Sequence, residues 1–368
     1  MPKLLLIILA AIFGVMAHAE DTVPPLRALW ISAYYPGWQR EVLKPPEIDF
    51  SAMTHLIHFS AIVRADGMLN FETHQIGEEQ AREIVAAGRK AQRPVLLCVG
   101  GGETGNGFQK AIGAAHREVL IAHLIEAVKA RGYDGLDLDM EPIQNADMEN
   151  YSAFVRALRT AMKEENDRWL LTAATGDMPG MFAAIQNEFD QINVMTYELS
   201  GPWDGWVTWH GSALTNGGLE FPQVRRPLPC VAEKMSEWIK AGIKPEKLGM
   251  GLAFFATAWH GAKAPNESIA GVKLEQLSYE VLMQKYFKPE RYHWHEAASV
   301  PYLSIDAVDA KDRLFISYED ERSLGLKIDY ARKPGLGGAI IWELGIGSRR
   351  TGERNPLLQT VEKAAFGK

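Results

Sequence analysis

Short apolar runs alternate with helical patterns from Leu26 to about Leu344, and this alternation limits the chain to few folds. Between the runs, apolar residues recur at helical spacing, as in Leu120, Leu124 and Val128. The runs cover residues 27–33, 55–61, 94–99, 135–140, 170–174, 192–197, 248–253 and 338–342. Strands that alternate with helices pair in parallel and are covered on both faces. The eight runs therefore predict an α/β fold, a closed (β/α)8 TIM barrel.

Residues 257–316 interrupt the alternation between the seventh and eighth runs. This stretch is too long for a simple strand-to-helix loop. We expect a small insertion there, beside the top of the barrel, and the sequence leaves its strand content open. No linker rich in Pro, Gly or Ser divides the chain, so residues 20–368 are predicted to form one barrel domain that carries this insertion.

The first residues predict an export signal. Lys3 precedes an apolar run at 4–15, and Ala17 and Ala19 are small residues that flank a cleavage point. We therefore expect residues 1–19 to be removed as a signal peptide and the mature protein to be secreted, into the periplasm or the medium. The apolar run is shorter than the roughly 20 residues that a membrane helix needs, and no later stretch approaches that length. No membrane partner is expected.

The net charge limits which partners the protein can bind, and the cysteines limit which disulfides it can form. The formal net charge is -7, which disfavours a polyanion such as nucleic acid and suits a neutral or cationic substrate. The two cysteines, Cys98 and Cys230, lie far apart in the sequence, and an exported protein could join them. Cys98 falls inside an apolar run, which favours a buried free thiol. The sequence does not decide whether they pair.

Residues 133–141 alternate apolar and acidic side chains with a period of two. In a strand, that period points Asp137, Asp139 and Glu141 to one face and the leucines and the methionine to the other. In a barrel the apolar face meets the helices, so the acids point inward. A buried charge costs several kcal/mol unless it is paired, hydrogen-bonded or protonated. The alternative is an edge strand with a solvated acidic face, which a place within a parallel series disfavours.

Glu141 comes last in this row, at the carboxyl end of the strand, where the catalytic groups of such barrels gather. Neighbouring carboxyl groups hold a proton to higher pH, so that one of them can act as a general acid. We predict that Glu141 is this acid. Asp139 and Asp137 are predicted to share a proton behind it.

The segment 134–141 resembles the D-x-x-D-x-D-x-E signature of the chitinases of glycoside hydrolase family 18. Residues 98–101 resemble the family's S-x-G-G on the third strand, with Cys in place of Ser. Residues 195–198 resemble its M-x-Y-D on the sixth strand, with Glu in place of Asp. Residues 337–343 resemble its eighth strand, which ends in a Trp. The resemblance extends along nearly the whole mature chain.

The resemblance implies a chitinase that hydrolyses β-1,4 bonds between N-acetylglucosamine units with retention, the sugar's own acetamide acting as nucleophile. Glu141 would be the general acid/base, Asp139 would orient the acetamide, and Tyr197 would donate a hydrogen bond to its oxygen. Trp342 would stack under the sugar ring. Chitin or N-acetylglucosamine oligosaccharides are the expected partners, and no cofactor is implied. The predicted substrate-binding residues are Trp342, Glu198, Met195, Tyr34, Trp203, Trp206, Gly100 and Gly101.

Glu198 is the departure from the family pattern that matters most. One added methylene moves a carboxylate by about an ångström, and catalytic positioning is sensitive on that scale. Trp203 and Trp206 follow the sixth predicted strand in a loop, where they either line subsites for successive sugars or pack locally.

Other functions remain as alternatives. Residues 100–105 match G-x-G-x-x-G after a predicted strand, but no acid at a strand end follows about 20 residues later, which disfavours a dinucleotide site. The acidic row could chelate a cation, yet the chain has no H-E-x-x-H or paired Cys/His spacing, so no metal is predicted. A non-catalytic chitin-binding lectin is disfavoured by the presence of Glu141. An endo-β-N-acetylglucosaminidase or a peptidoglycan-type hydrolase of the same family stays open, as does endo against exo action.

Overall fold

The computed structural model describes residues 28–102, 104–347 and 354–367. The predicted signal peptide, residues 1–19, lies outside the described residues. No helix within the described ranges has the length and apolar character needed to cross a membrane.

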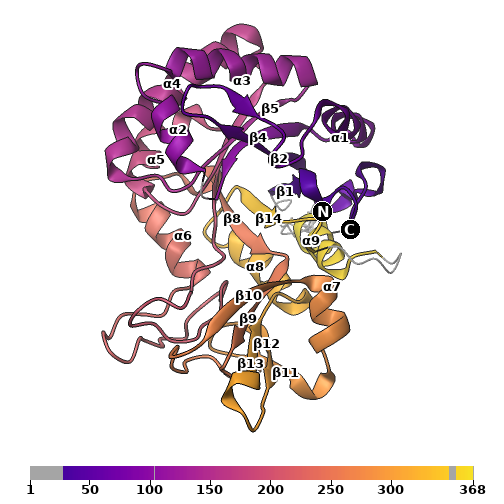
Figure 1. Ribbon diagram of the computed structural model, residues 1–368, viewed down its shortest axis with the longest axis vertical. Helices are drawn as coiled ribbons and strands as arrows, with labels where there is room; N and C mark the ends of the chain where they lie inside the picture. The colour runs from indigo at the N-terminus through magenta and orange to yellow at the C-terminus, as the bar shows by residue number, and fades with distance from the viewer. Residues whose placement is uncertain (1–27, 103, 348–353, 368) are drawn as a thin grey trace, which may run out of the picture.

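Eight parallel strands close into a barrel (Figure 1). Strand β1 (Trp30–Pro36) pairs with both β2 (His55–Val63) and β14 (Gly338–Trp342), which joins the two ends of the sheet. The other barrel strands are β4 (Val95–Gly101), β5 (Gly135–Met140), β6 (Leu170–Thr175), β7 (Gln191–Val194) and β8 (Leu248–Ala253). Short strand β3 (Leu69–Asn70) pairs antiparallel with β2. The predicted fold class is confirmed, and each of the eight apolar runs forms a barrel strand.

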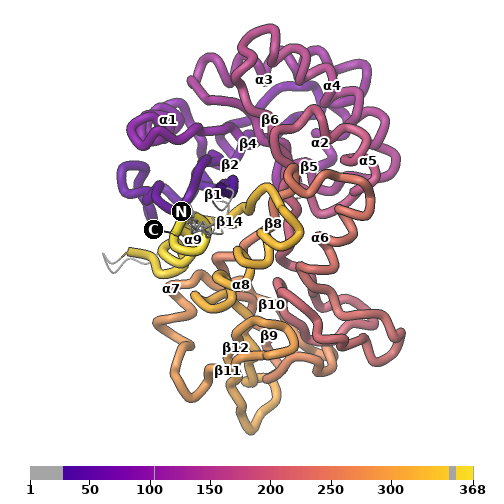
Figure 2. Tube along the Cα trace, turned by 180° about the vertical axis from the view of Figure 1, so that it is seen from behind, coloured from indigo at the N-terminus to yellow at the C-terminus, as the bar shows by residue number. Residues whose placement is uncertain are grey.

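Helices surround the barrel, as both ribbon and tube show (Figures 1 and 2). On α3 (Arg117–Arg131), the apolar residues Leu120, Leu124 and Val128 are buried, as their spacing predicts. The other helices are α1 (Glu78–Ala91), α2 (Gly105–Ala111), α4 (Met148–Glu165), α5 (Pro179–Ile185), α6 (Val231–Lys240), α7 (Tyr279–Val281), α8 (Glu321–Arg332) and α9 (Pro356–Phe366). A π-helical turn, η7 (Leu282–Tyr286), follows α7. Short 3₁₀ turns are η1 (Gly37–Gln39), η2 (Pro45–Glu47), η3 (Phe50–Ala52), η4 (Asn145–Asp147), η5 (Gln186–Glu188), η6 (Pro245–Lys247), η8 (Pro289–Arg291) and η9 (Ala310–Asp312).

Between β8 and α8 the chain forms a second sheet of five antiparallel strands, in the order β10-β9-β13-β12-β11. It lies below the barrel in Figure 1. Its strands are β9 (Phe255–His260), β10 (Lys273–Ser278), β11 (Tyr292–His295), β12 (Val300–Ile305) and β13 (Leu314–Ser317). The sequence left the strand content of residues 257–316 open because short strands of mixed polarity have no clear period.

The two faces of the barrel strands belong to different apolar layers. Leu136, Leu138 and Met140 of β5 lie in the large layer between strands and helices. Asp137 and Asp139 are buried on the opposite face, toward the barrel interior. The period of two in the sequence therefore predicts the direction of the acidic row correctly.

Both cysteines are free thiols and both are buried. Cys98 lies in the interior of the barrel beside Asp137, whereas Cys230 lies in a separate cluster at the start of α6. Burial raises the pKa of the Cys98 thiol, and the negative charge of Asp137 adds to this rise. The structure thus decides the question that the sequence left open: the two cysteines do not pair.

Gly338 is the point at which β14 meets β1. A Cβ atom at this position would lie 1.7 Å from the carbonyl oxygen of Trp30. We expect Gly338→Ala to lower the free energy of unfolding by about 3 kcal/mol, because the closing strands must separate to admit the methyl group. Urea denaturation of the two proteins measures the difference.

Gly325→Ala is the matched control. Gly325 lies within α8, and an added Cβ would meet no atom within 4 Å. This substitution should raise stability by roughly 0.5–1 kcal/mol, because alanine is the better helix former. Equal stability of Gly338→Ala and the unmodified protein would contradict the packing described at the barrel closure.

Candidate active site

The acidic row of β5 begins with Asp137, which is fully buried inside the barrel. Its Oδ2 accepts a hydrogen bond of 2.8 Å from the Tyr34 hydroxyl, and its Oδ1 accepts one of 2.5 Å from the Thr172 hydroxyl. These donors come from β1 and β6. Burial raises the pKa of Asp137, while the hydrogen bonds from Thr172 and Tyr34 oppose the rise.

Asp139 lies two positions further along the strand and remains buried, with 3% exposure. Burial raises the pKa of Asp139 well above its usual range, and the negative charges of Glu141 and Asp137 add to the effect. Asp139 and Glu141 share a hydrogen bond that stabilises the proton on Asp139. Oδ1 of Asp139 is buried, and no N–H or O–H group donates to it among the described residues.

This arrangement differs from the predicted sharing of a proton between Asp139 and Asp137. Both oxygens of Asp137 already accept hydrogen bonds from hydroxyl groups, so the hydrogen-bonded carboxyl pair is Asp139 with Glu141. Burial also raises the pKa of Glu141, the hydrogen bond from Asp139 opposes this, and the charges of Glu198 and Asp177 raise it further.

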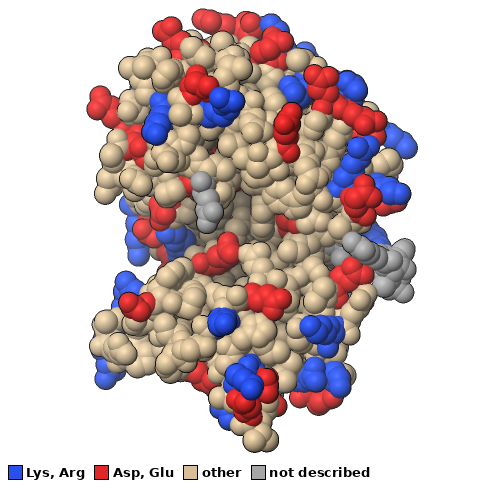
Figure 3. All heavy atoms as spheres, in the orientation of Figure 1, with Lys and Arg blue, Asp and Glu red and all other residues tan. Residues whose placement is uncertain are grey.

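Glu141 opens onto a cleft of about 290 Å³ at the carboxyl ends of the barrel strands. The space-filling view shows this face hollowed between the barrel and the insertion, with acidic side chains in and beside the hollow (Figure 3). The cleft is lined by Tyr34, Trp38, Phe59, His74, Gly102, Asp139, Glu141, Ala174, Met195, Tyr197, Glu198, Gln276 and Trp342.

One wall of the cleft is aromatic. Trp342, at the end of β14, meets Tyr34 and Phe59 edge to face, with ring centroids 5.4 and 4.8 Å apart. Trp38, which is 38% exposed, packs edge to face on Phe59 at 5.6 Å. This geometry leaves ring faces available to an apolar surface of a ligand.

Tyr197 and Met195 reach the cleft just after β7. The ring of Tyr197 occupies the space that Gly251 leaves on β8, where a Cβ would lie 2.7 Å from a ring carbon. Burial raises the pKa of Tyr197 well above its usual range, and the charges of Asp139 and Glu141 add to the rise. The phenol is therefore neutral, and its O–H is a donor.

Glu198 lines the cleft next to the insertion, whose Gln276 also belongs to the lining. Its backbone adopts the left-handed conformation, with φ of 53°. Its Oε1 accepts a hydrogen bond of 2.7 Å from Nε2 of Gln276, which belongs to β10 of the insertion. The carboxylate thus connects the end of a barrel strand to the second sheet.

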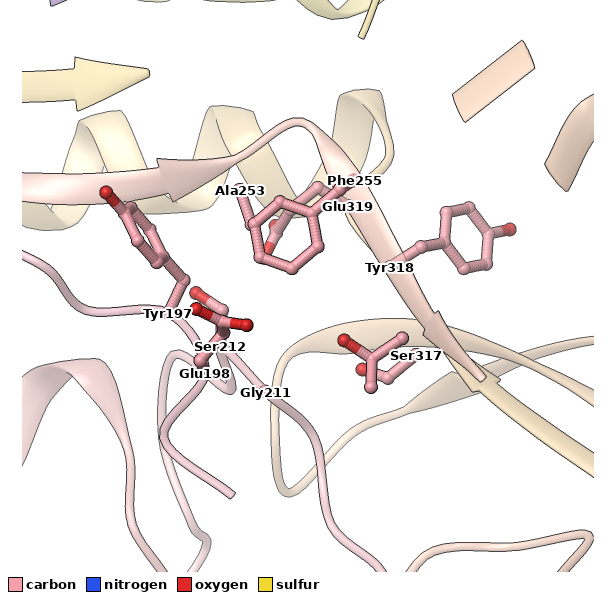
Figure 4. A pocket seen from close by; sticks show the side chains of 10 residues that line it. Tyr197, Glu198, Gly211, Ser212, Ala253, Phe255, Ser317, Tyr318 and Glu319 are labelled. Atoms are coloured by element: carbon pink, nitrogen blue, oxygen red, sulfur yellow. The ribbon is translucent and has the colours of Figure 1, made fainter. Parts of the chain in front are cut away.

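Beneath the Tyr197–Glu198 turn lies a small cavity of about 10 Å³ (Figure 4). Its lining includes Ser212 and Glu319, and Lys327 reaches both. Burial raises the pKa of Glu319 and lowers that of Lys327, while their mutual attraction opposes both shifts. This fully buried ion pair supports the turn that carries Tyr197 and Glu198.

Four predicted substrate-binding residues lie elsewhere. Trp203 and Trp206 pack on each other at 4.5 Å, and Trp206 packs on Phe221, in a cluster separate from the cleft lining. Gly100 and Gly101 both have positive φ and allow close packing of the strands. A Cβ on Gly100 would lie 2.0 Å from the Asp139 carbonyl oxygen, and a Cβ on Gly101 would lie 2.6 Å from the Phe59 ring. The protein's own atoms occupy the space that these glycines leave.

The structure also brings residues to the cleft that sequence reasoning missed. Phe59 alternates with Ile57 on the inner face of β2, a signal that the strand pattern contained. His74, Gln276 and Ala174 carried no comparable signal. His74 reaches the cleft through the path of a loop, and Gln276 reaches it through the path of the insertion.

The end of the glycine-rich segment, at Gly105, packs against the chain that follows β5. The backbone N–H of Gly105 donates a 2.8 Å hydrogen bond to the carbonyl oxygen of Glu141, so the start of α2 packs on the end of β5. In the described ranges, no group of three or more His, Cys, Asp and Glu side chains could hold a metal ion.

Fold and site together define a class: a parallel (β/α)8 barrel whose inward acidic row ends in a carboxyl group at an aromatic cleft. The pattern described as glycosyl hydrolases family 18 matches residues 31–346, and the chain belongs to this family.

Comparison with individual proteins agrees with this assignment. The chain is 29% identical over 307 residues to "Chitinase A1" of Niallia circulans, covering 73% of this chain but 42% of that protein. It is 27% identical over 340 residues to "Class V chitinase CHIT5a" of Medicago truncatula, covering 85% of each. In fold it resembles the Group IV chitinase of Ostrinia furnacalis, solved in complex with allosamidin, with a TM-score of 0.76, 21% identity, and coverage of 91% of this chain and 98% of that one.

Glu343 follows Trp342 and holds the adjoining loop. Its buried carboxylate accepts hydrogen bonds from the backbone N–H groups of Gly345 and Ile346 and from the Gln39 amide, at 2.6, 2.9 and 3.0 Å. Burial raises the pKa of Glu343 to about 7, although these bonds oppose the rise.

Stability should therefore fall as Glu343 ionises. The pKa is higher in the folded than in the unfolded chain, so its contribution is complete below pH about 4.5 and is lost as pH rises through about 7. We expect this group alone to account for a loss on the order of 3 kcal/mol. Unfolding free energies at several pH values should show a shallower decline for Glu343→Gln than for the unmodified protein. An unchanged slope would contradict the assignment.

Proposed function

We propose that this protein is a chitinase: it hydrolyses β-1,4 bonds of chitin or N-acetylglucosamine oligosaccharides, with Glu141 as general acid/base. The observation that carries the proposal is the position of Glu141, outermost in the acidic row, on the cleft, and hydrogen-bonded to Asp139. The raised pKa of Glu141 favours its protonated form, which a general acid requires. The names of the relatives support the substrate class.

The proposed reaction proceeds with retention through the substrate's own acetamide. A sugar stacks on Trp342, and the neutral Tyr197 hydroxyl donates a hydrogen bond to the acetamide oxygen. Asp139, whose free Oδ1 lacks a partner in the described part of the chain, orients the acetamide N–H. The acetamide oxygen attacks the anomeric carbon while Glu141 gives its proton to the departing glycosidic oxygen, which leaves an oxazolinium ion and a Glu141 carboxylate.

Water completes the reaction in this proposal. Glu141, now a carboxylate, takes a proton from a water molecule as that water attacks the anomeric carbon. The ring of the oxazolinium opens, the acetamide is restored, and Glu141 regains its proton. Asp137 does not touch the substrate: it is enclosed by Tyr34 and Thr172, and its charge helps keep Asp139 protonated.

We further propose that the protein acts outside the cytoplasm, after removal of residues 1–19. The basic residue, apolar run and small residues at this end support export.

Replacing the general acid should separate chemistry from binding. Glu141→Gln is expected to lower kcat on N-acetylglucosamine oligomers of defined length by about 10²–10⁴-fold, because the amide cannot supply the proton. Chromatography of the products measures turnover. Glu126→Gln, on the exposed side of α3, should retain the activity of the unmodified protein. Full turnover by folded Glu141→Gln would remove the assignment, and release of sugars from labelled glycoprotein instead of oligomers would change the substrate.

We expect Gln276 to affect catalysis by positioning the carboxylate of Glu198. Gln276→Ala is expected to lower kcat/KM about fivefold, equivalent to about 1 kcal/mol, since Glu198 loses the hydrogen bond that places it. In a protein that already carries Glu198→Ala, adding Gln276→Ala should lower kcat/KM little further.

Gln284→Ala is the control for this pair, because exposed Gln284 also bonds to a glutamate, Glu280, but does not line the cleft. It should leave kcat/KM unchanged. Fully additive effects of Glu198→Ala and Gln276→Ala would show that the two residues act independently.

A further inference from the structure

His74 reaches the cleft from the loop between β3 and α1. Its half-buried ring stacks on Phe59, with centroids 5.4 Å apart and planes 19° from parallel, and meets Trp38 edge to face at 5.1 Å. The backbone of His74 is also closely packed, because it lies against Gly37: a Cβ on Gly37 would be 2.2 Å from the His74 carbonyl oxygen. The imidazole is therefore held in one place on the aromatic wall.

The hydrogen bonds of Ser60 determine where the His74 ring carries its proton. The Ser60 hydroxyl lies 2.8 Å from the Gly100 carbonyl oxygen, which can only accept, so the single hydroxyl hydrogen is used there. Ser60 Oγ also lies 2.7 Å from Nδ1 of His74 and must accept from it. Because burial lowers the pKa of His74, the ring is neutral at neutral pH, with its proton on Nδ1 and a lone pair on Nε2.

His74 is one of the residues that line the cleft. No hydrogen bond of Nε2 occurs within the part of the chain that the structure describes. Among the described residues, the side chains around His74 on this wall are rings: Trp38 and Phe59 contact it, and Trp342 contacts Phe59. The Tyr34 hydroxyl is already bound to Asp137. A sugar that lies against these rings directs its hydroxyl groups sideways, where they need acceptors.

We propose that His74 is a further substrate-positioning residue, whose Nε2 accepts a hydrogen bond from a hydroxyl group of a sugar unit bound along the aromatic wall. This inference rests on the proposed function, because it assumes that the cleft binds a sugar chain. It assigns to the loop after β3 a specific part in recognition that the acidic row and Trp342 do not supply.

Binding can be measured without turnover in the Glu141→Gln background. Titration calorimetry with an N-acetylglucosamine hexamer should give about a tenfold weaker Kd for added His74→Phe, which keeps a ring on Phe59 but has no acceptor. Added His74→Gln, whose side-chain oxygen can accept, should bind within about threefold of the background. His293→Ala, on the exposed side of β11, is the control and should change nothing.

A spectroscopic measurement tests the tautomer directly. Long-range ¹H–¹⁵N spectra of protein labelled at histidine should show His74 protonated at Nδ1, and the Nε2 resonance should shift when the hexamer is added. Ser60→Ala should weaken the preference for this tautomer. A ring protonated at Nε2, or His74→Phe that binds as tightly as the background, would overturn the proposal.

The outcomes also separate this inference from the proposed function. Binding that depends on His74, in a protein whose unmodified form hydrolyses no oligomer, would refute the hydrolase and leave the role of His74 standing. Hydrolysis with an unchanged KM in His74→Phe would refute the role of His74 alone. Absence of any binding to the hexamer would overturn both.

Discussion

Enclosing carboxyl groups in a barrel is the constraint on which the rest of this structure depends. Asp137 and Asp139 are buried in the interior and Glu141 lies partly buried at its mouth, so the row is accommodated by hydrogen bonds and by retained protons. Hydroxyl donors from β1 and β6 satisfy the deepest acid, and a carboxyl pair shares a proton nearer the surface. The same burial that makes the row costly to fold is what raises the pKa of its outermost member.

A second consequence is that support for the cleft is distributed over the whole fold. The Tyr197–Glu198 turn lines the same small cavity as Glu319, which Lys327 of α8 joins to Ser212. Glu198 also contacts the insertion. Trp342 is followed by Glu343, which holds its loop. Several parts of the cleft are therefore positioned by hydrogen bonds between segments that are distant in the sequence: Lys327 to Ser212, Gln276 to Glu198 and Gln39 to Glu343.

The sequence predicted what depends on local periodicity. The alternation of apolar and acidic residues in 133–141 predicted which face of β5 is acidic, and the repeated apolar runs predicted the barrel strands. It did not predict contacts between distant segments. Gln276 and His74 approach the cleft through the path of the insertion and of a loop, and no period encodes such paths. Trp203 and Trp206 were predicted from their loop either to bind sugar or to pack locally. They contact each other outside the residues that line the cleft, with Trp206 against Phe221 and Trp203 48% exposed, a placement that also depends on the path of a loop.

The state of the two sulfur atoms has a practical consequence. The chain contains two cysteines, and both are buried free thiols that lie in different clusters. No disulfide has to form before the barrel can close, so folding does not require an oxidant or a disulfide isomerase. The same native state is thus accessible in a reducing cytosol and in an oxidising compartment, and reductants in a purification buffer leave it intact.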